Sequence, residues 1–302
     1  MAQARANRSL DLLVLQAIRD QMAPAGNVFR RSLTMLAVCR SICGQIQHAL
    51  PAAAAIEFFV AALDVLDDIE DEDNEMALWK RHGRALALNA STALLMLAQL
   101  AAARLRLKSV SNVTVARAME MIASSGAMAC AGQHYDIEYE SRPSISEAQY
   151  FKMIGMKSAA LVECASRIGA LLAGADDRQI ESLGMFGRYL GIAYQIENDV
   201  DSISSQQAGK SDITKRKKTL PVVFALSNAD EEARDWLASI YSAREPIGPE
   251  LESKVSQLLG SCGAVHYSII RAEMYRRKAA KVLADSGIPH GAVRSMSSAL
   301  GL

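Results

Sequence analysis

Three aspartates in one short segment have the spacing of a divalent-metal site. Asp67, Asp68 and Asp71 directly follow an apolar stretch of the chain. On a helix, Asp67 and Asp71 are one turn apart on the same face, with Asp68 beside them. Carboxylates at this spacing can clamp a hard cation such as Mg²⁺, although a solvated acidic helix end shows the same pattern.

A second set of oxygen ligands follows apolar sequence in the second half of the chain. Asn198, Asp199 and Ser202 stand at helical spacing, directly after Tyr194 and Gln195. Two such sets could hold several Mg²⁺ ions around a polyphosphate.

Lysines that could neutralise a phosphate stand in two further segments. Lys157 opens an apolar helical stretch together with Ser158, and Lys210 and Lys217 belong to the basic run at 209–221. An ammonium group is a usual partner of phosphate, whereas a basic run alone is more often a solvated loop.

The elements that must position these side chains are predicted to be helices. Apolar residues recur at helical spacing, no stretch alternates with period two, and the seven prolines are widely spaced. No break is long enough to be a linker, so we expect one domain over residues 1–302. The expected helices are 8–22, 29–49, 52–73, 83–105, 112–139, 145–174, 178–203, 219–228, 231–242, 250–260, 263–285 and 290–300.

Composition excludes several classes of protein. The 33 basic residues equal the 33 acidic ones, which disfavours a nucleic-acid binder, and half of the residues are apolar, which excludes a disordered chain. The five cysteines form no CxxC pair, so neither a disulfide framework nor a zinc cage is indicated, and we expect a cytoplasmic protein. The uncharged stretch 85–103 contains Asn89 and Gln99, which favours a buried helix over a membrane span.

The motifs together resemble those of the polyprenyl synthetase (trans-isoprenyl diphosphate synthase) superfamily over about residues 25–285. The first Asp-rich motif DDxxD matches at 67–71, the GQxxD motif at 132–136 and the Lys-Ser element at 157–158. The second Asp-rich region and the following Lys-x-Thr-Leu-Pro run match, in part, at Tyr194, Gln195, Asn198, Asp199, Ser202, Gly209, Lys210, Asp212, Lys217 and 219–221.

This resemblance implies an all-α, isoprenoid-synthase-type bundle around a deep central cavity, usually a homodimer without a membrane span. Its substrate would be an allylic prenyl diphosphate bound with Mg²⁺, three ions in all. The implied metal ligands are Asp67, Asp68, Asp71, Asn198, Asp199 and Ser202. Lys157, Lys210, Lys217 and Gln133 would bind the diphosphate, Gln195 would act in catalysis, and Phe59, Ala62, Leu63 and Tyr194 would line a pocket for C15 or longer chains.

The elements that bind isopentenyl diphosphate in chain-elongating members are incomplete here. Arg30 and Arg31 remain of the early basic motif, Val60 stands near an expected His, and 80–83 reads Lys-Arg-His-Gly. Because a diphosphate without these donors would be poorly compensated, we expect prenyl transfer to another acceptor.

Three alternatives to this expectation stay open. The segment after Asp67 is similar to ComQ-type enzymes, which prenylate a peptide tryptophan, so a peptide or a small molecule could be the acceptor. Residues 198–206 resemble the metal motif of class I terpene synthases, with Gln206 in place of Glu, which favours cyclisation. Chain elongation and a non-catalytic partner subunit are the remaining alternatives.

Overall fold

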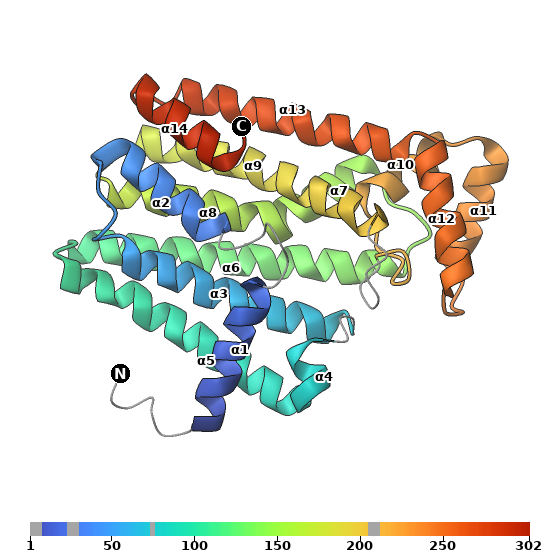
Figure 1. Cartoon of the computed structure of the whole chain (residues 1–302), viewed down its shortest axis with the longest axis horizontal. Helices are drawn as coiled ribbons and strands as arrows, with labels where there is room; N and C mark the ends of the chain where they lie inside the picture. Colours follow the sequence, from blue (N-terminus) through green and yellow to red (C-terminus); the bar gives the residue numbers. More distant parts are fainter. Residues whose placement is uncertain (1–7, 23–29, 73–75, 205–211) are drawn as a thin grey trace. The chain divides into compact units, whose positions relative to one another are not determined.

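The computed structural model describes residues 8–22, 30–72, 76–204 and 212–302, and every regular element within these ranges is helical (Figure 1). The predicted all-α class is thus confirmed. In chain order the elements are α1 Arg8–Met22, α2 Arg30–Cys43, α3 Leu50–Glu70, α4 Leu78–His82, α5 Arg84–Ala103, η2 Arg104–Lys108, α6 Asn112–Glu140, α7 Glu147–Ile154, η3 Gly155–Ala159, α8 Ala160–Leu172, α9 Asp177–Ser204, α10 Leu220–Asn228, α11 Glu231–Ser242, α12 Pro249–Ser261, α13 Ala264–Ala284 and α14 His290–Leu300.

Two predicted boundaries near the first Asp-rich motif are wrong, and local backbone geometry gives the reason. The helix expected over 29–49 stops at Cys43 because Gly44 has φ +74°, the left-handed conformation that terminates helices. Helix α3 then begins at Leu50, with Pro51 in its first turn, and ends at Glu70 rather than at residue 73.

The single helix predicted over 145–174 is divided into three elements. Helix α7 passes into η3, which is a turn of π-helix, and α8 continues from it. A π turn accommodates one extra residue and is common at functional sites, but apolar periodicity does not reveal it. The short elements α4 and η2 were also not predicted.

The chain divides into two compact units. Unit 1 comprises Met1–Ser124, Cys164–Gly184 and Leu283–Gly301, and unit 2 comprises Ser125–Glu163 and Met185–Val282 with the last residue. The expectation of one domain over residues 1–302 stays a prediction.

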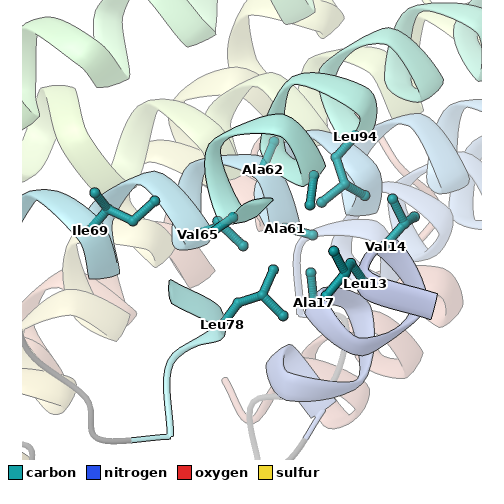
Figure 2. Packing of buried hydrophobic residues seen from close by; sticks show 11 residues of the cluster. Leu13, Val14, Ala17, Ala61, Ala62, Val65, Ile69, Leu78 and Leu94 are labelled. Carbon is teal, nitrogen blue, oxygen red and sulfur yellow. The ribbon is translucent and has the colours of Figure 1, made fainter. Parts of the chain in front are cut away.

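The core of unit 1 forms where α3 packs against α5. Small residues at this contact let the two backbones approach closely, and the Ser91 hydroxyl donates to the Ala62 carbonyl at 3.0 Å. Figure 2 shows part of this core, which also takes in α1 and α4. Its buried residues are Leu13, Val14, Ala17, Ala61, Ala62, Val65, Ile69, Leu78, Ala87, Ala90 and Leu94.

The segment Arg84–Lys108 is long and apolar enough to cross a membrane, judged by length and composition only. Of its most apolar window, 39% is buried within the protein, and one side of α5 packs in the core. A core helix passes the same test, so this segment does not show a membrane span.

Unit 2 contains two groups of buried side chains that fix its helices. Tyr139, Tyr150 and Ile196 bring α6, α7 and α9 together, along with residues of α10 and α13. Helices α10, α11 and α12 pack on one another around Leu226, Leu237 and Leu259 (Figure 1). The first group packs beside the buried polar residues Asp136 and Asp199 of the same helices.

Candidate active site

The three aspartates of the first motif lie at the carboxyl end of α3 in unit 1. Asp67, Asp68 and Asp71 are half-buried, while Val65 and Ile69 on the same helix anchor it in the core (Figure 2). The helix ends there, and the Asp71 N–H donates to the Asp67 carbonyl at 2.8 Å. The negative end of the helix dipole adds to the carboxylate charge, so this terminus suits a cation.

Two lysines of unit 2 meet on one buried carboxylate. Asp136 on α6 accepts hydrogen bonds from the Nζ of Lys157 at 2.7 Å and of Lys217 at 3.1 Å. Lys217 also pairs with Glu140 at 2.7 Å. Burial by itself raises the pKa of Asp136, but the two ammonium groups outweigh it and hold that pKa below its usual value. The carboxylate therefore stays charged and holds two cations side by side.

The backbone of η3 lies directly against α6, and this contact requires glycine. A Cβ atom added to Gly132 would lie 2.2 Å from the backbone nitrogen of Lys157. Gly191 on α9 is similarly close, with the Ala159 Cα 2.7 Å from such an atom. The glycine of the GQxxD motif thus brings Lys157 to Asp136.

Asp199 is buried and is bound by three protein donors. One carboxylate oxygen accepts from the Tyr150 hydroxyl at 2.6 Å and from the Leu220 N–H at 3.0 Å, and the other accepts from Gln195 at 2.9 Å. The Gln195 amide oxygen in turn accepts from Ser158 at 2.6 Å. Burial raises the pKa of Asp199 to about 7, although its hydrogen bonds oppose this shift.

The other members of the second set lie closer to solvent. Asn198 is exposed, and the half-buried Ser202 hydroxyl donates to the Asp199 carbonyl at 2.9 Å. The Asn198 amide and the Ser202 hydroxyl are oxygen ligands that Mg²⁺ accepts. The Asp199 carboxylate already joins α7, α9 and α10 through its donors.

The oxygen-rich donor sets fit Mg²⁺, since the three aspartates of unit 1 supply the negative charge that a hard cation needs. Asn198 and Ser202 provide neutral oxygens in unit 2. Asp199 fits less directly, because three donors occupy its oxygens. The predicted ligand roles of all six residues stay predictions.

Several predicted residues lie elsewhere or outside the described ranges. Lys210, with Gln206 and Gly209, lies in the segment 205–211, outside the described residues. Ala62 is fully buried in the contact between α3 and α5, whereas Phe59, Leu63 and Gln133 are half-buried. Tyr194 packs with its ring 5.5 Å from the Arg276 guanidinium, which is paired with Glu197. The predicted pocket and diphosphate roles of these residues stay predictions.

A basic side chain that could bind a second diphosphate already forms an ion pair within unit 1. Arg81, in the basic segment after the first motif, pairs with Asp20 on α1. Val60 is buried, with 3% of its surface exposed. Residues 25–29 of the early motif lie outside the described ranges, whereas its two arginines, Arg30 and Arg31, begin α2.

Two polar residues of the site were not predicted. Tyr150 is fully buried on α7 and bonds Asp199, and Glu140 at the end of α6 bonds Lys217. The sequence did carry a local signal for α7, since Ser146 and Gln149 form a capping box at its start. No motif, however, marks Tyr150 as a hydrogen-bond partner of Asp199.

Comparison with known proteins identifies the family. Residues 13–259 match the family model described as polyprenyl synthetase. A short chain isoprenyl diphosphate synthase of Methanothermobacter thermautotrophicus is 31% identical over 264 residues, which cover 84% of this chain and 79% of the relative. A geranylgeranyl diphosphate synthase of Sulfolobus acidocaldarius is 32% identical over 268 residues, covering 84% of this chain and 80% of the relative.

Solved structures show the same fold. The polyprenyl synthetase of Streptomyces coelicolor A3(2) has a TM-score of 0.80 at 27% identity and covers 97% of this chain and 96% of its own. The geranylgeranyl pyrophosphate synthetase of Pyrococcus horikoshii has a TM-score of 0.81 at 26% identity, covering 96% and 89%. The chain therefore has the isoprenoid synthase fold and belongs to the polyprenyl synthetase family of prenyltransferases.

Proposed function

We propose that the chain is a Mg²⁺-dependent chain-elongating enzyme that joins an allylic prenyl diphosphate to isopentenyl diphosphate. The relatives just described are diphosphate synthases of this kind, and they favour elongation over the transfer to another acceptor that the sequence led us to expect. The observation that carries the proposal is the pair of ammonium groups on Asp136, which offers a diphosphate two adjacent positive charges.

The proposed reaction begins with cleavage of the bond between the allylic carbon and the diphosphate oxygen. The electron pair goes to the diphosphate, where the ammonium groups of Lys157 and Lys217 stabilise the added charge. Bound Mg²⁺ would supply further positive charge at the leaving oxygen. The double bond of isopentenyl diphosphate then attacks the allylic cation, and the released diphosphate accepts the proton that is lost.

Gln195 and Tyr150 act in this proposal as positioning residues. Gln195 receives the Ser158 hydroxyl on its amide oxygen and donates to Asp199, so its side chain is held at both ends. Tyr150 fixes the other oxygen of Asp199. These bonds fix η3 relative to α9 and thereby hold Lys157, the residue before Ser158, in position.

A second candidate is ionisation of a single allylic diphosphate, followed by transfer to another acceptor or by cyclisation. The observation that favours it is the engagement of Arg81 by Asp20, together with the buried apolar Val60. The ion pair with Asp20 occupies the Arg81 charge, and Val60 offers no charge at all, so less positive charge is available for a second diphosphate. The ComQ-type and terpene synthase alternatives need only one diphosphate site.

One assay separates these candidates. The purified chain is incubated with Mg²⁺ and geranyl, farnesyl or geranylgeranyl diphosphate, each with and without isopentenyl diphosphate, and the products are identified by mass spectrometry. Longer prenyl diphosphates that form only with isopentenyl diphosphate are the expected result. Diphosphate release without it, yielding hydrocarbons, cyclic alcohols or linear alcohols, would contradict elongation and support the second candidate.

Removal of the first metal ligands tests the Mg²⁺ requirement. Asp67→Ala and Asp71→Ala should reduce turnover by at least about 100-fold and raise the Mg²⁺ concentration needed for half-maximal rate, because hard cations bind through carboxylates. Glu70→Gln, at an exposed position on the same helix, is the matched control. Near-normal rates in both aspartate variants, with circular dichroism unchanged, would remove the proposed Mg²⁺ clamp.

We also propose that the chain forms a homodimer in the cytoplasm through α5. Leu86, Met96 and Leu100 lie on one side of this helix at helical spacing, and each exposes about half of its surface, for example 54% for Met96. A row of large apolar side chains suits a protein interface better than open solvent.

A further inference from the structure

Two cysteines and a histidine of unit 1 converge at the turn between α2 and α3. Cys39 lies one helical turn before Cys43, the last residue of α2, and His48 precedes α3. The two Sγ atoms are 3.9 Å apart, and the Cys39 Sγ lies 3.7 Å from the His48 Nε2. The ligand atoms of all three side chains lie within 4.8 Å of one another. Sequence spacing without a CxxC pair counted against such a site, but the turn at Gly44 brings His48 back to the helix end.

The two distances from the Cys39 Sγ match the edges of a tetrahedral zinc centre. With Zn–S near 2.3 Å and Zn–N near 2.0 Å, tetrahedral angles place two sulfurs about 3.8 Å apart and a sulfur and a nitrogen about 3.6 Å apart. The two distances from the Cys39 Sγ exceed these values by about 0.1 Å, and the third edge, between the Cys43 Sγ and the His48 ring nitrogen, is at most 4.8 Å. Thiolate and imidazole are also the ligands that Zn²⁺ prefers, whereas Mg²⁺ prefers oxygen.

The surroundings leave one side of the cluster accessible. Cys39 is fully buried, Cys43 is exposed and His48 is half-buried, so the three ligands run from the core to the surface. The side of Cys43 is therefore open to water as a fourth ligand, which zinc sites with three protein ligands commonly use.

Contacts within the protein compete with a metal ion. Both thiols donate to the Gln45 carbonyl, Cys39 at 3.4 Å and Cys43 at 3.3 Å, and a bound ion would end these weak bonds. The His48 Nε2 lies 2.9 Å from the Leu172 carbonyl, so metal binding at this nitrogen would move the proton to Nδ1 and end that bond. Burial and the neighbouring Cys43 raise the pKa of Cys39 to about 12, so a bound ion must release the thiol proton to the solvent. Zinc–thiolate bonds are strong enough to drive such proton release in structural zinc sites.

We propose that Cys39, Cys43 and His48 bind one Zn²⁺ ion, which fastens the end of α2 to the turn before α3. The fourth ligand would be water.

Cobalt substitution with excess Mg²⁺ tests the proposal directly. Mg²⁺ saturates the oxygen sites, and Co²⁺ bound to thiolate gives a near-ultraviolet charge-transfer band that carboxylate sites lack. We expect one equivalent of Co²⁺ to develop this band in the reduced full chain and Zn²⁺ to displace it. Absence of the band, or a band that persists in the variants described next, would overturn the proposal.

Variants at the surface side of the cluster avoid loss of the fold. Cys43→Ser and His48→Gln should each weaken Zn²⁺ binding by more than about tenfold, since even loss of a group that only hydrogen-bonds a ligand has an effect of this size. Competition with a chromophoric chelator measures the affinity. The control Cys262→Ser removes a cysteine directly after α12, outside the cluster, and should leave the Zn²⁺ affinity unchanged. Equal affinity in all variants would show adventitious binding. None of these readouts depends on prenyl transfer.

Discussion

At the scale of single residues, charge is concentrated on a few buried side chains of unit 2. Asp136 and Lys217 are each 7% exposed, and they form an ion pair in which Lys157 also takes part. Removing one partner of such a group leaves another charge uncompensated. Substitution of one of these buried charged residues should therefore weaken ligand binding more than substitution of an exposed lysine does.

Substitution of Lys157 tests this arrangement. Lys157→Met should weaken the binding of inorganic diphosphate by about tenfold or more, since a charge-assisted contact to phosphate is lost. Isothermal titration calorimetry measures the affinity, and Lys152→Met on the exposed side of α7 is the control. Unchanged affinity in Lys157→Met would contradict the role of this lysine in the proposed diphosphate site.

Lys218 makes the free energy of unfolding depend on pH. It is 1% exposed, its Nζ donates to the Arg216 carbonyl at 3.0 Å, and it lies 4.9 Å from the centre of the Tyr241 ring. Burial lowers its pKa from 10.5 to about 8. Between these two values the unfolded chain binds the proton more tightly than the folded chain, so the free energy of unfolding rises with pH across this interval.

Replacing Lys218 by methionine should remove that rise. The part due to Lys218 amounts to about 3 kcal/mol between pH 8 and pH 10.5. Urea unfolding at several pH values in this range measures it. Lys281→Met, at an exposed position of α13, should keep the slope of the wild-type chain. If Lys218→Met keeps it too, Lys218 is not the titrating group.

At the scale of elements, the close contact between α6 and η3 decides whether the lysines meet Asp136. The Lys157 nitrogen would lie 2.2 Å from a methyl group at position 132, and backbone atoms do not give way easily. Gly132→Ala should therefore separate η3 from α6, lower the free energy of unfolding by about 3 kcal/mol and weaken diphosphate binding.

A second glycine provides the control for this prediction. Gly260 lies in α12 with open space around its Cα, so Gly260→Ala should be neutral or stabilising by about 0.5–1 kcal/mol. Thermal unfolding and calorimetry with diphosphate measure both variants. A Gly132→Ala protein with wild-type stability and affinity would show that this contact is not needed.

Helices were predictable from sequence where one apolar face decides the structure, as in α6 and α9, whose bounds match the expected ones closely. Local backbone geometry was less predictable. Gly44 ended α2 early, and the π turn of η3 has no periodic signature. Motifs found Asp136, Lys157 and Lys217, but Tyr150 carries no motif, because its partner Asp199 is close only in the folded chain.

At the scale of the whole molecule, the exposed apolar side of α5 predicts self-association. Met96→Lys combined with Leu100→Lys places charge on this side and should shift the chain from dimer to monomer in sedimentation velocity at micromolar concentration. Lys substitutions at exposed Leu12 and Leu15 of α1 are the control. A wild-type chain that sediments as a monomer would contradict the proposed interface.

The π turn at 155–159 has a consequence for insertions and deletions. Tyr150 on one side of it bonds Asp199, and Ser158 within it bonds Gln195. Because the π turn holds one residue more than a regular α-helical turn, loss of one residue from it would restore regular α-helix and shift the residues of η3 by one position relative to Tyr150. The number of residues in this stretch, and not only their identity, therefore decides which side chain meets Asp136 and which meets Gln195.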